Sequence, residues 1–220
     1  MVNSLYILSS SDKKTAKRIY LFEKPVISMI KLWVWGSFVV LHWMHLSFFR
    51  RAIEDAVVLS NDPDFELSVV IITDKEVSAR RNNIPPLFNE QERLNFIKKL
   101  PYVSQVHIDD YDHGMKSLIE FNPDYIFLGE DQNKSFDTGL ADIIRKNNLK
   151  TQIRVVNNRK IASSTSIREV YKDNKPFLEN QINKMIQSEN EYYSTFISHI
   201  NHIHRTGLYF IDSLTPLIRM

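Results

Sequence analysis

Short apolar runs alternate with longer mixed segments along most of this chain. The runs rich in bulky apolar residues are short enough to be strands, and they lie near residues 30–36, 67–73, 103–108, 124–129 and 151–157. The segments between them predict helices near residues 45–58, 89–99, 114–121 and 138–147. Continuous apolar strands that alternate with helices are typical of a parallel sheet covered on both faces. The pattern therefore predicts an α/β fold, a Rossmann-like doubly wound parallel sheet of five strands.

The two flanks of this pattern differ from its centre. Residues 1–28 mix polar and apolar positions, which indicates an N-terminal extension that is either a solvated arm or a packing segment. Residues 176–205 carry apolar side chains at near-helical spacing and predict one long helix or a helical pair. We therefore expect an α/β domain at residues 29–172, followed by a helical C-terminal segment at residues 173–220.

Composition narrows the classes of protein that this chain can represent. Hydrophobic residues make up 43% of the 220 positions, which is enough for a core, and the net charge of +2 argues against a broad nucleic-acid footprint. The chain has no cysteine and no uninterrupted apolar core of signal-peptide length near its start, so we expect a cytoplasmic protein. Lys31, Gly36 and His42 interrupt the most apolar stretch, which a strand and a helix explain better than a membrane span.

A phosphate-binding arrangement is predicted where the first strand ends. Gly36 follows the apolar run IKLWVW, at a point where the chain must turn tightly or let a ligand approach the backbone. A helix is expected to begin near His45, and the free N–H groups and dipole at a helix N-terminus favour anions. His42 and His45 are three residues apart and can face the same phosphate, where their N–H groups would stabilise developing charge.

A second signature follows about 120 residues later, in the sequence Ser163-Ser164-Thr165-Ser166-Ile167-Arg168. It offers small hydroxyl groups at another predicted helix start, followed by an arginine that can bind phosphate oxygens. Such a segment can hold a departing pyrophosphate. Together, the two signatures favour transfer of a nucleotidyl group from a nucleoside triphosphate to a phosphorylated acceptor.

The two signatures resemble those of the HxGH nucleotidyltransferases, in particular the cytidylyltransferase branch typified by glycerol-3-phosphate cytidylyltransferases. That branch has roughly GTFDxxHxGH where this chain has Gly36 to His45, and roughly ISTTxI where this chain has Ala162 to Ile167. Three further segments agree in order: Thr73-Asp74-Lys75-Glu76; Glu92-Arg93 with Pro101 to Val106; and Leu128-Gly129-Glu130-Asp131 with Lys134 to Asp137. The resemblance covers about residues 29 to 172.

Two positions of the first motif depart from the family pattern. Met44 stands where the family has the glycine between its histidines, and Val39 stands where it has an aspartate. The glycine lets the nucleotide lie close to the backbone. A nucleotide-binding or assembly module that has lost turnover through these two changes is therefore one alternative to an active enzyme.

The resemblance implies a role for each candidate site residue. The catalytic residues would be His42, His45, Arg159, Ser164 and Thr165. The nucleotide would be bound by Gly36, Ser37, Phe38, His42, His45, Gly129, Glu130, Asp131, Ser163, Ser164, Thr165 and Arg168, and the acceptor by Thr73, Asp74, Arg80, Arg81 and Arg93. A Mg²⁺ ion would bridge the triphosphate without needing protein ligands. His199, His202 and His204 indicate a solvated or packing face rather than a metal site.

The resulting hypothesis is a cytidylyltransferase that transfers CMP from CTP to a small phosphorylated alcohol similar to glycerol 3-phosphate and releases pyrophosphate. The main alternative is an adenylyltransferase of the same superfamily that acts on a sugar phosphate or a mononucleotide, because the string from Ser163 to Arg168 is also close to that of nicotinamide mononucleotide adenylyltransferases. We expect no nucleic-acid or membrane partner, and a homodimer, which is usual in the resembled family.

Overall fold

The structure is a computed structural model that describes residues 29–109, 115–129, 139–156 and 164–206 of the chain. The N-terminal extension expected at residues 1–28 and the last residues of the C-terminal segment lie outside these ranges.

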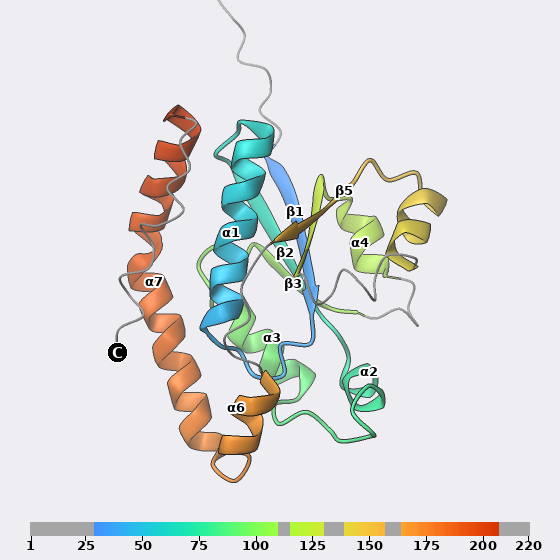
Figure 1. Ribbon diagram of the computed structural model, residues 1–220, viewed down its shortest axis with the longest axis vertical. Coiled ribbons are helices and arrows are strands. Elements are labelled where there is room, and N and C mark those ends of the chain that lie inside the picture. The colour runs from blue at the N-terminus through green and yellow to red at the C-terminus, as the bar shows by residue number, and fades with distance from the viewer. Residues whose placement is uncertain (1–28, 110–114, 130–138, 157–163, 207–220) are drawn as a thin grey trace, which may run out of the picture.

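A five-stranded parallel sheet forms the centre of the molecule, as the sequence predicts (Figure 1). Its strands are β1 (Ile30–Gly36), β2 (Phe65–Ile71), β3 (Gln105–Ile108), β4 (Tyr125–Gly129) and β5 (Gln152–Val156). Their spatial order is β3-β2-β1-β4-β5, and every neighbouring pair is parallel. The carboxyl ends of all strands therefore lie at one edge of the sheet.

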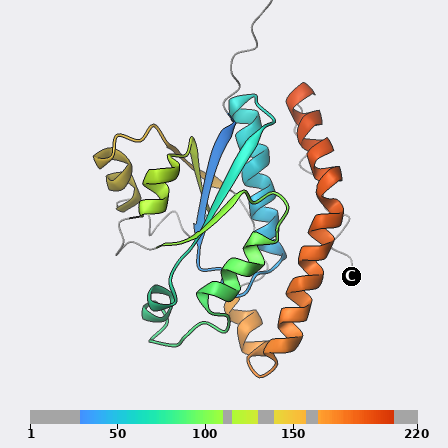
Figure 2. The ribbon, with the colours of Figure 1, turned by 180° about the vertical axis from the view of Figure 1, so that it is seen from behind.

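Helices cover both faces of this sheet. They are α1 (Trp43–Ser60), α2 (Asp74–Ala79), α3 (Glu90–Lys98), α4 (Lys116–Phe121), α6 (Ser164–Tyr171) and α7 (Lys175–Thr206), with a further helix described at residues 139–146. Leu32 and Val34 of β1 pack in one core cluster with α1, α3 and α7, while Trp33 and Trp35 pack on the other face with α2 and α4. The two layers are visible from both sides (Figures 1 and 2).

Strand β2 differs from the sequence prediction in its start, and helix α2 differs in its existence. Strand β2 begins at Phe65, two residues before the predicted start, because Phe65 and Glu66 pair in register with Ile30 and Lys31 of β1. Helix α2 was not predicted, since its six residues are too few to show a helical period. Thr73 defines its start by accepting a hydrogen bond from the Glu76 N–H at its side-chain oxygen, 3.2 Å away.

The C-terminal segment forms one 32-residue helix, α7, which lies beside α1 (Figure 1). Its buried face consists of Leu178, Ile182, Ile186, Glu189, Phe196, Ile200 and Ile203, which recur at helical spacing. Phe196 packs edge to face with Tyr102, with ring centroids 6.2 Å apart. A 2.7 Å ion pair between Arg50 of α1 and Glu189 joins the two helices. The long helix therefore covers the outer side of α1.

Candidate nucleotide site

The candidate site lies at the carboxyl edge of the sheet, where β1 and β4 end side by side. The strand order reverses between these two strands, because β2 and β3 follow on one side and β5 on the other. Ligands of doubly wound sheets bind at such a reversal, beyond the carboxyl ends of the strands. Gly36 ends β1 and Gly129 ends β4, so both predicted glycines border this place.

The loop from Ser37 to Leu41 joins β1 to α1 in an unusual conformation. Phe38 has a left-handed backbone with φ of 41°, and its ring folds back over Gly36. A Cβ atom at Gly36 would lie 2.9 Å from the Phe38 ring, closer than real contacts allow. A larger residue at position 36 would therefore require the Phe38 ring to shift. The same ring meets His45 edge to face at a centroid distance of 5.1 Å.

The two motif histidines lie together at the N-terminus of α1. His42 is the N-cap residue, and its ring stacks on that of His45 with centroids 3.9 Å and planes 28° apart. The His42 backbone N–H donates to Nδ1 of His45 over 3.3 Å. This acceptor role places the proton of a neutral His45 ring on Nε2. The pair thus combines an N–H donor with the positive end of a helix dipole.

Both departures from the family motif are buried. Val39 has no exposed surface and belongs to the apolar cluster that includes Trp35 and Val77. Met44 is 6% exposed and occupies the first turn of α1, where a helical backbone does not require glycine. The surroundings of position 39 are therefore apolar and favour valine over a carboxylate.

The second signature meets the first in space. The Ser164 hydroxyl, at the start of α6, donates to the backbone carbonyl of Val40 at 3.2 Å, across 124 residues of sequence. Thr165, Ser166 and Arg168 follow within the same helix. The two segments that the sequence connected by chemistry are thus in direct contact.

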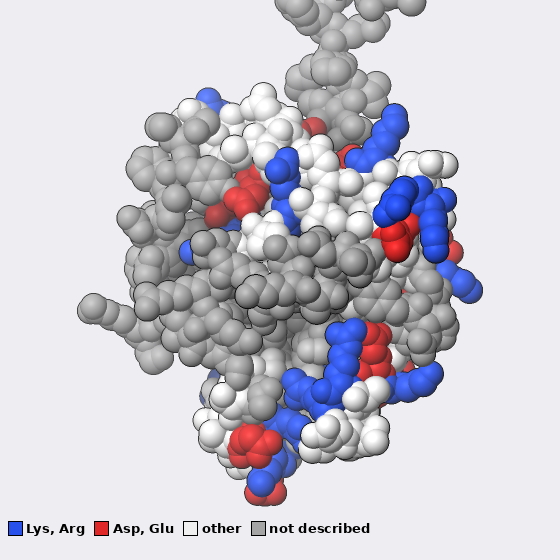
Figure 3. Space-filling model, turned by 45° about the vertical axis from the view of Figure 1, so that its right-hand side comes forward, with Lys and Arg blue, Asp and Glu red and all other residues white. Residues whose placement is uncertain are grey.

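Arg168 also approaches Arg81, which follows α2. Burial and the nearby Arg168 charge together lower the pKa of Arg81. Within the described ranges, neither guanidinium group has a carboxylate partner. Figure 3 shows Lys and Arg side chains gathering on the lower part of the molecule, where α2 and α6 lie in Figure 1. Two partly buried arginines that repel each other, and that pair with no carboxylate among the described residues, favour an anion between them.

The other residues predicted to bind the acceptor are engaged inside the scaffold. Arg93 is 1% exposed, and its Nη2 donates to the Ile72 carbonyl at 2.9 Å and to Asp74 Oδ1 at 2.6 Å. The carboxylates of Asp74 and Glu90 cap each other's backbone N–H groups, at 3.1 and 2.8 Å. The sequence offers Glu90 or Asp74 as a partner for Arg93, and the structure pairs Arg93 with Asp74. Sequence analysis did not assign Glu90 to the site, although its place at a helix start after Asn89 was an available signal.

Arg80 has a different environment from its neighbour Arg81. It forms an ion pair with Glu76 one turn earlier in α2, and its guanidinium lies 5.5 Å from the centroid of the Trp35 ring. This packing position on Trp35 was not expected from the sequence. Four residues that the sequence assigns to the site lie outside the described residues: Glu130, Asp131, Arg159 and Ser163. The structure describes the backbone of Thr165 but not its side chain.

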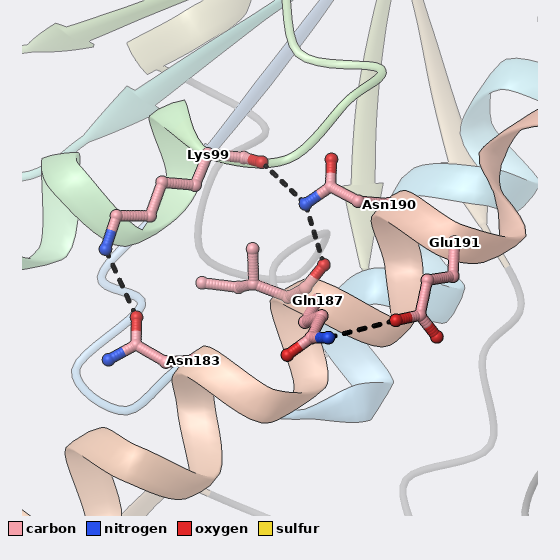
Figure 4. A pocket seen from close by; sticks show the side chains of 6 residues that line it. Lys99, Asn183, Gln187, Asn190 and Glu191 are labelled. Atoms are coloured by element: carbon pink, nitrogen blue, oxygen red, sulfur yellow. Dashed lines mark hydrogen bonds between the residues drawn. The ribbon is translucent and has the colours of Figure 1, made fainter.

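A hollow lies between the end of α3 and the middle of α7 (Figure 4). Its volume is about 540 Å³, and Lys99, Asn183, Ile186, Gln187, Asn190 and Glu191 line it. Lys99 Nζ donates to Asn183 at 3.2 Å, and Gln187 donates to Glu191 at 3.0 Å. The polar groups of this hollow thus bind one another, and none of the predicted site residues borders it.

The histidines of α7 have a carboxylate neighbour that sequence analysis did not foresee. Glu54 of α1 lies 3.6 Å from His199 Nε2. Among the residues that the structure describes, no group of three His, Cys, Asp or Glu side chains could hold a metal ion. A Mg²⁺ ion bound through the phosphates of a nucleotide would need no such group. No helix in the described ranges is long and apolar enough to span a membrane.

Comparison with known proteins identifies the relatives of this chain. Residues 33–170 match the family described as cytidylyltransferase-like. An FAD synthase of Thermoplasma acidophilum is 33% identical over 54% of this chain and 73% of its own length. An FAD synthase of Archaeoglobus fulgidus is 31% identical over 61% of this chain and 91% of its own length. The crystal structure of a lipopolysaccharide core biosynthesis protein from Thermoplasma volcanium matches 60% of this chain and all of that chain, with 30% identity and a TM-score of 0.48.

Proposed function

Because the chain belongs to the cytidylyltransferase-like family of nucleotidyltransferases, we propose that it is an adenylyltransferase that transfers AMP from ATP to the phosphate of FMN. The observation that carries this proposal is the kind of enzyme that the chain resembles in sequence: these relatives are FAD synthases, not glycerol-3-phosphate cytidylyltransferases. The expectation of CTP as the donor, made from the motifs, has no support in these comparisons. The adenylyltransferase alternative takes its place.

The reaction is a single displacement at phosphorus. A phosphate oxygen of FMN attacks the α-phosphorus of ATP, the bond from that phosphorus to the bridging oxygen of the β-phosphate breaks, and pyrophosphate leaves with the electron pair. No covalent enzyme intermediate is required. The protein's task is to align the reacting phosphates and to stabilise charge on them.

The geometry of the site supports a division of roles. His42 and His45, at the N-terminus of α1, would bind the α- and β-phosphates, with Nε2–H of His45 as one donor. Ser164 and Arg168 of α6 would bind the leaving pyrophosphate, since Ser164 already contacts the loop before His42. Arg81, beside Arg168, would complete this anion site from the other side. A Mg²⁺ ion on the triphosphate would neutralise part of its charge.

The test is a matrix of donors and acceptors. The purified full chain would be given ATP or CTP together with FMN or glycerol 3-phosphate, with pyrophosphate release measured by a coupled assay and products identified by mass spectrometry. We expect FAD and pyrophosphate from ATP and FMN only. Formation of CDP-glycerol from CTP, or no FAD while another pair reacts, would overturn the proposal.

The buried Val39 favours one second candidate, a nucleotide-binding module without turnover. Val39 stands where the family has an aspartate, and it is buried within a core cluster. The chain therefore has no carboxylate at this position to contribute to catalysis. Calorimetry with ATP together with the pyrophosphate assay separates the two candidates. A module without turnover would bind ATP but would release no pyrophosphate in the presence of FMN.

A further inference from the structure

Phe38 holds a backbone conformation that bulky L-residues rarely adopt. Its φ of 41° lies in the left-handed region, within the loop that leads from Gly36 to the motif histidines. Such a residue persists only where its surroundings hold it in place, and this occurs most often at binding sites. The contact that holds the peptide before Phe38 is therefore of functional interest.

That contact comes from Arg93 of α3. Its Nη1 donates to the carbonyl oxygen of Ser37, while Nη2 donates to the carbonyl of Ile72 and to the carboxylate of Asp74. The Arg93 side chain has no exposed surface, and its Nε is also shielded from solvent. One guanidinium group thus joins the ends of β1 and β2 to the start of α2, and it presents no N–H group at the surface.

The hydrogen bond from Arg93 to the Ser37 carbonyl fixes the orientation of the Phe38 backbone N–H. In a planar trans peptide the C=O of one residue and the N–H of the next point in opposite directions. Because the Ser37 carbonyl faces Arg93, the Phe38 N–H faces away from it. No hydrogen bond from this N–H to a described residue is present. The Phe38 ring lies against His45, so this amide belongs to the same loop and helix start as the histidine pair.

We propose that Arg93 is a positioning residue that holds the Ser37–Phe38 peptide with the Phe38 N–H directed toward the bound polyphosphate. This inference rests on the proposed binding of a nucleoside triphosphate at the β1–α1 loop. It replaces the sequence-based expectation that Arg93 itself binds the acceptor phosphate. Phe38 is a left-handed residue beside a helix N-terminus, and its N–H donates to no described residue. Such an arrangement forms an anion-binding concavity, which the buried arginine keeps in shape.

The amide can be observed directly in the full chain labelled with ¹⁵N-phenylalanine. The Phe38 cross-peak is identified by its loss in Phe38→Tyr, which keeps the aromatic ring. We expect this peak to move when inorganic pyrophosphate, and separately ATP, is added to the wild-type protein. A Phe38 peak that stays in place while pyrophosphate binding is evident at other residues overturns the proposal. This measurement needs no turnover, so it holds even if FAD is not formed.

Substitution then separates positioning from ligand binding. Arg93→Lys keeps the charge beside Asp74 but cannot bond both carbonyl groups, and we expect kcat to fall at least about tenfold with the KM for FMN within about threefold. The Phe38 response to pyrophosphate should weaken in the same variant. Lys98→Gln, on the exposed side of α3, is the matched control and should change neither.

Two other outcomes would contradict a positioning role. A large rise in the KM for FMN with unchanged kcat would make Arg93 an acceptor ligand. A lowered melting temperature with unchanged kinetics and an unchanged Phe38 response would make its role purely structural. Arg93→Gln provides a second variant if Arg93→Lys does not fold, with the same expected loss of the Phe38 response.

Discussion

The hydroxyl of Ser164 donates a hydrogen bond to the backbone carbonyl of Val40 at 3.2 Å, although 124 residues separate them. Val40 lies in the loop after β1, and Ser164 begins α6, so this bond joins the two segments that carry the residues proposed to bind phosphate. The distance between Arg168 and the histidine pair therefore depends on it.

Ser164→Ala tests this connection. Loss of the bond should lower the free energy of unfolding by about 1 kcal/mol, since a typical intramolecular hydrogen bond contributes that much. Pyrophosphate release should fall more, by at least about tenfold, because a phosphate donor is lost and α6 is less well placed. Urea unfolding and the coupled assay measure the two effects. Ser198→Ala, exposed on α7, should alter neither, and equal turnover in the two variants would contradict the assignment.

His45→Ala and His42→Ala should each reduce kcat by a factor on the order of 10²–10³, because each removes a donor to charge that develops on the phosphates. Circular dichroism should show a retained fold. The control is His107→Ala on β3, whose ring Nε2 lies 3.1 Å from the Gln105 side-chain oxygen. Undiminished pyrophosphate release in both motif variants would remove the histidines from the mechanism.

Val39→Asp should destabilise the protein, although it restores the family residue. The side chain would lie within an apolar cluster, and a buried carboxylate without a partner costs on the order of 3 kcal/mol or more. Burial would raise its pKa, so the loss should be smaller at pH 5 than at pH 8. Val39→Thr, similar in shape but uncharged, is the control for volume. Denaturant unfolding at both pH values measures the difference, and an Asp variant as stable as Thr at pH 8 would show that position 39 reaches solvent.

Glu54 predicts a pH dependence of stability at the α1–α7 interface. Burial raises its pKa from 4.5 to about 7, and Arg50 partly offsets this effect. The folded state then binds more protons than the unfolded state between these values, so stability falls as pH rises from about 4.5 to 7. The loss amounts to at most about 3 kcal/mol at pH 8.

Glu54→Gln should remove this contribution and be more stable than the wild type at pH 8, with the difference shrinking toward pH 5. The neighbouring His199 has a pKa lowered by burial and by His202, so its own contribution to stability rises with pH, opposite to that of Glu54. Thermal unfolding across this pH range provides the comparison. A stability difference that does not change with pH would mean that Glu54 does not titrate there.

Phe196→Ala should lower the free energy of unfolding by about 3–5 kcal/mol, because it empties a space between α7 and Tyr102. Phe196 is 1% exposed, whereas Phe177 of the same helix is 42% exposed and serves as the matched control. Phe177→Ala should cost less than about 1 kcal/mol. Similar losses in both variants would mean that α7 is not held by this buried face.

The strands and long helices were predictable from the sequence because each carries its own periodic signal. Trp33 and Val34 belong to a continuous apolar run, and Ile182 and Ile186 repeat at the spacing of a helix, so local pattern alone indicates strand and helix. The short helix α2 has too few residues for such a signal and depends on the Thr73 cap and on the contacts of Asp74. The motif histidines were also predictable, since their chemistry and spacing are local.

Only the tertiary structure decided what these residues touch. The sequence presents Arg93 as one more basic group for a phosphate, but α3 inserts it between two strand ends, where backbone carbonyls take its hydrogen bonds. It assigns Arg81 to the acceptor and Arg168 to the nucleotide, and the fold brings them close enough that Arg168, together with burial, lowers the pKa of Arg81. Burial and Coulomb forces act through space, whereas a sequence pattern records only neighbours along the chain. For that reason the sequence determined the elements and the type of chemistry, and the packing of those elements decided which side chains bond the scaffold, as Arg93 does at Ile72 and Asp74.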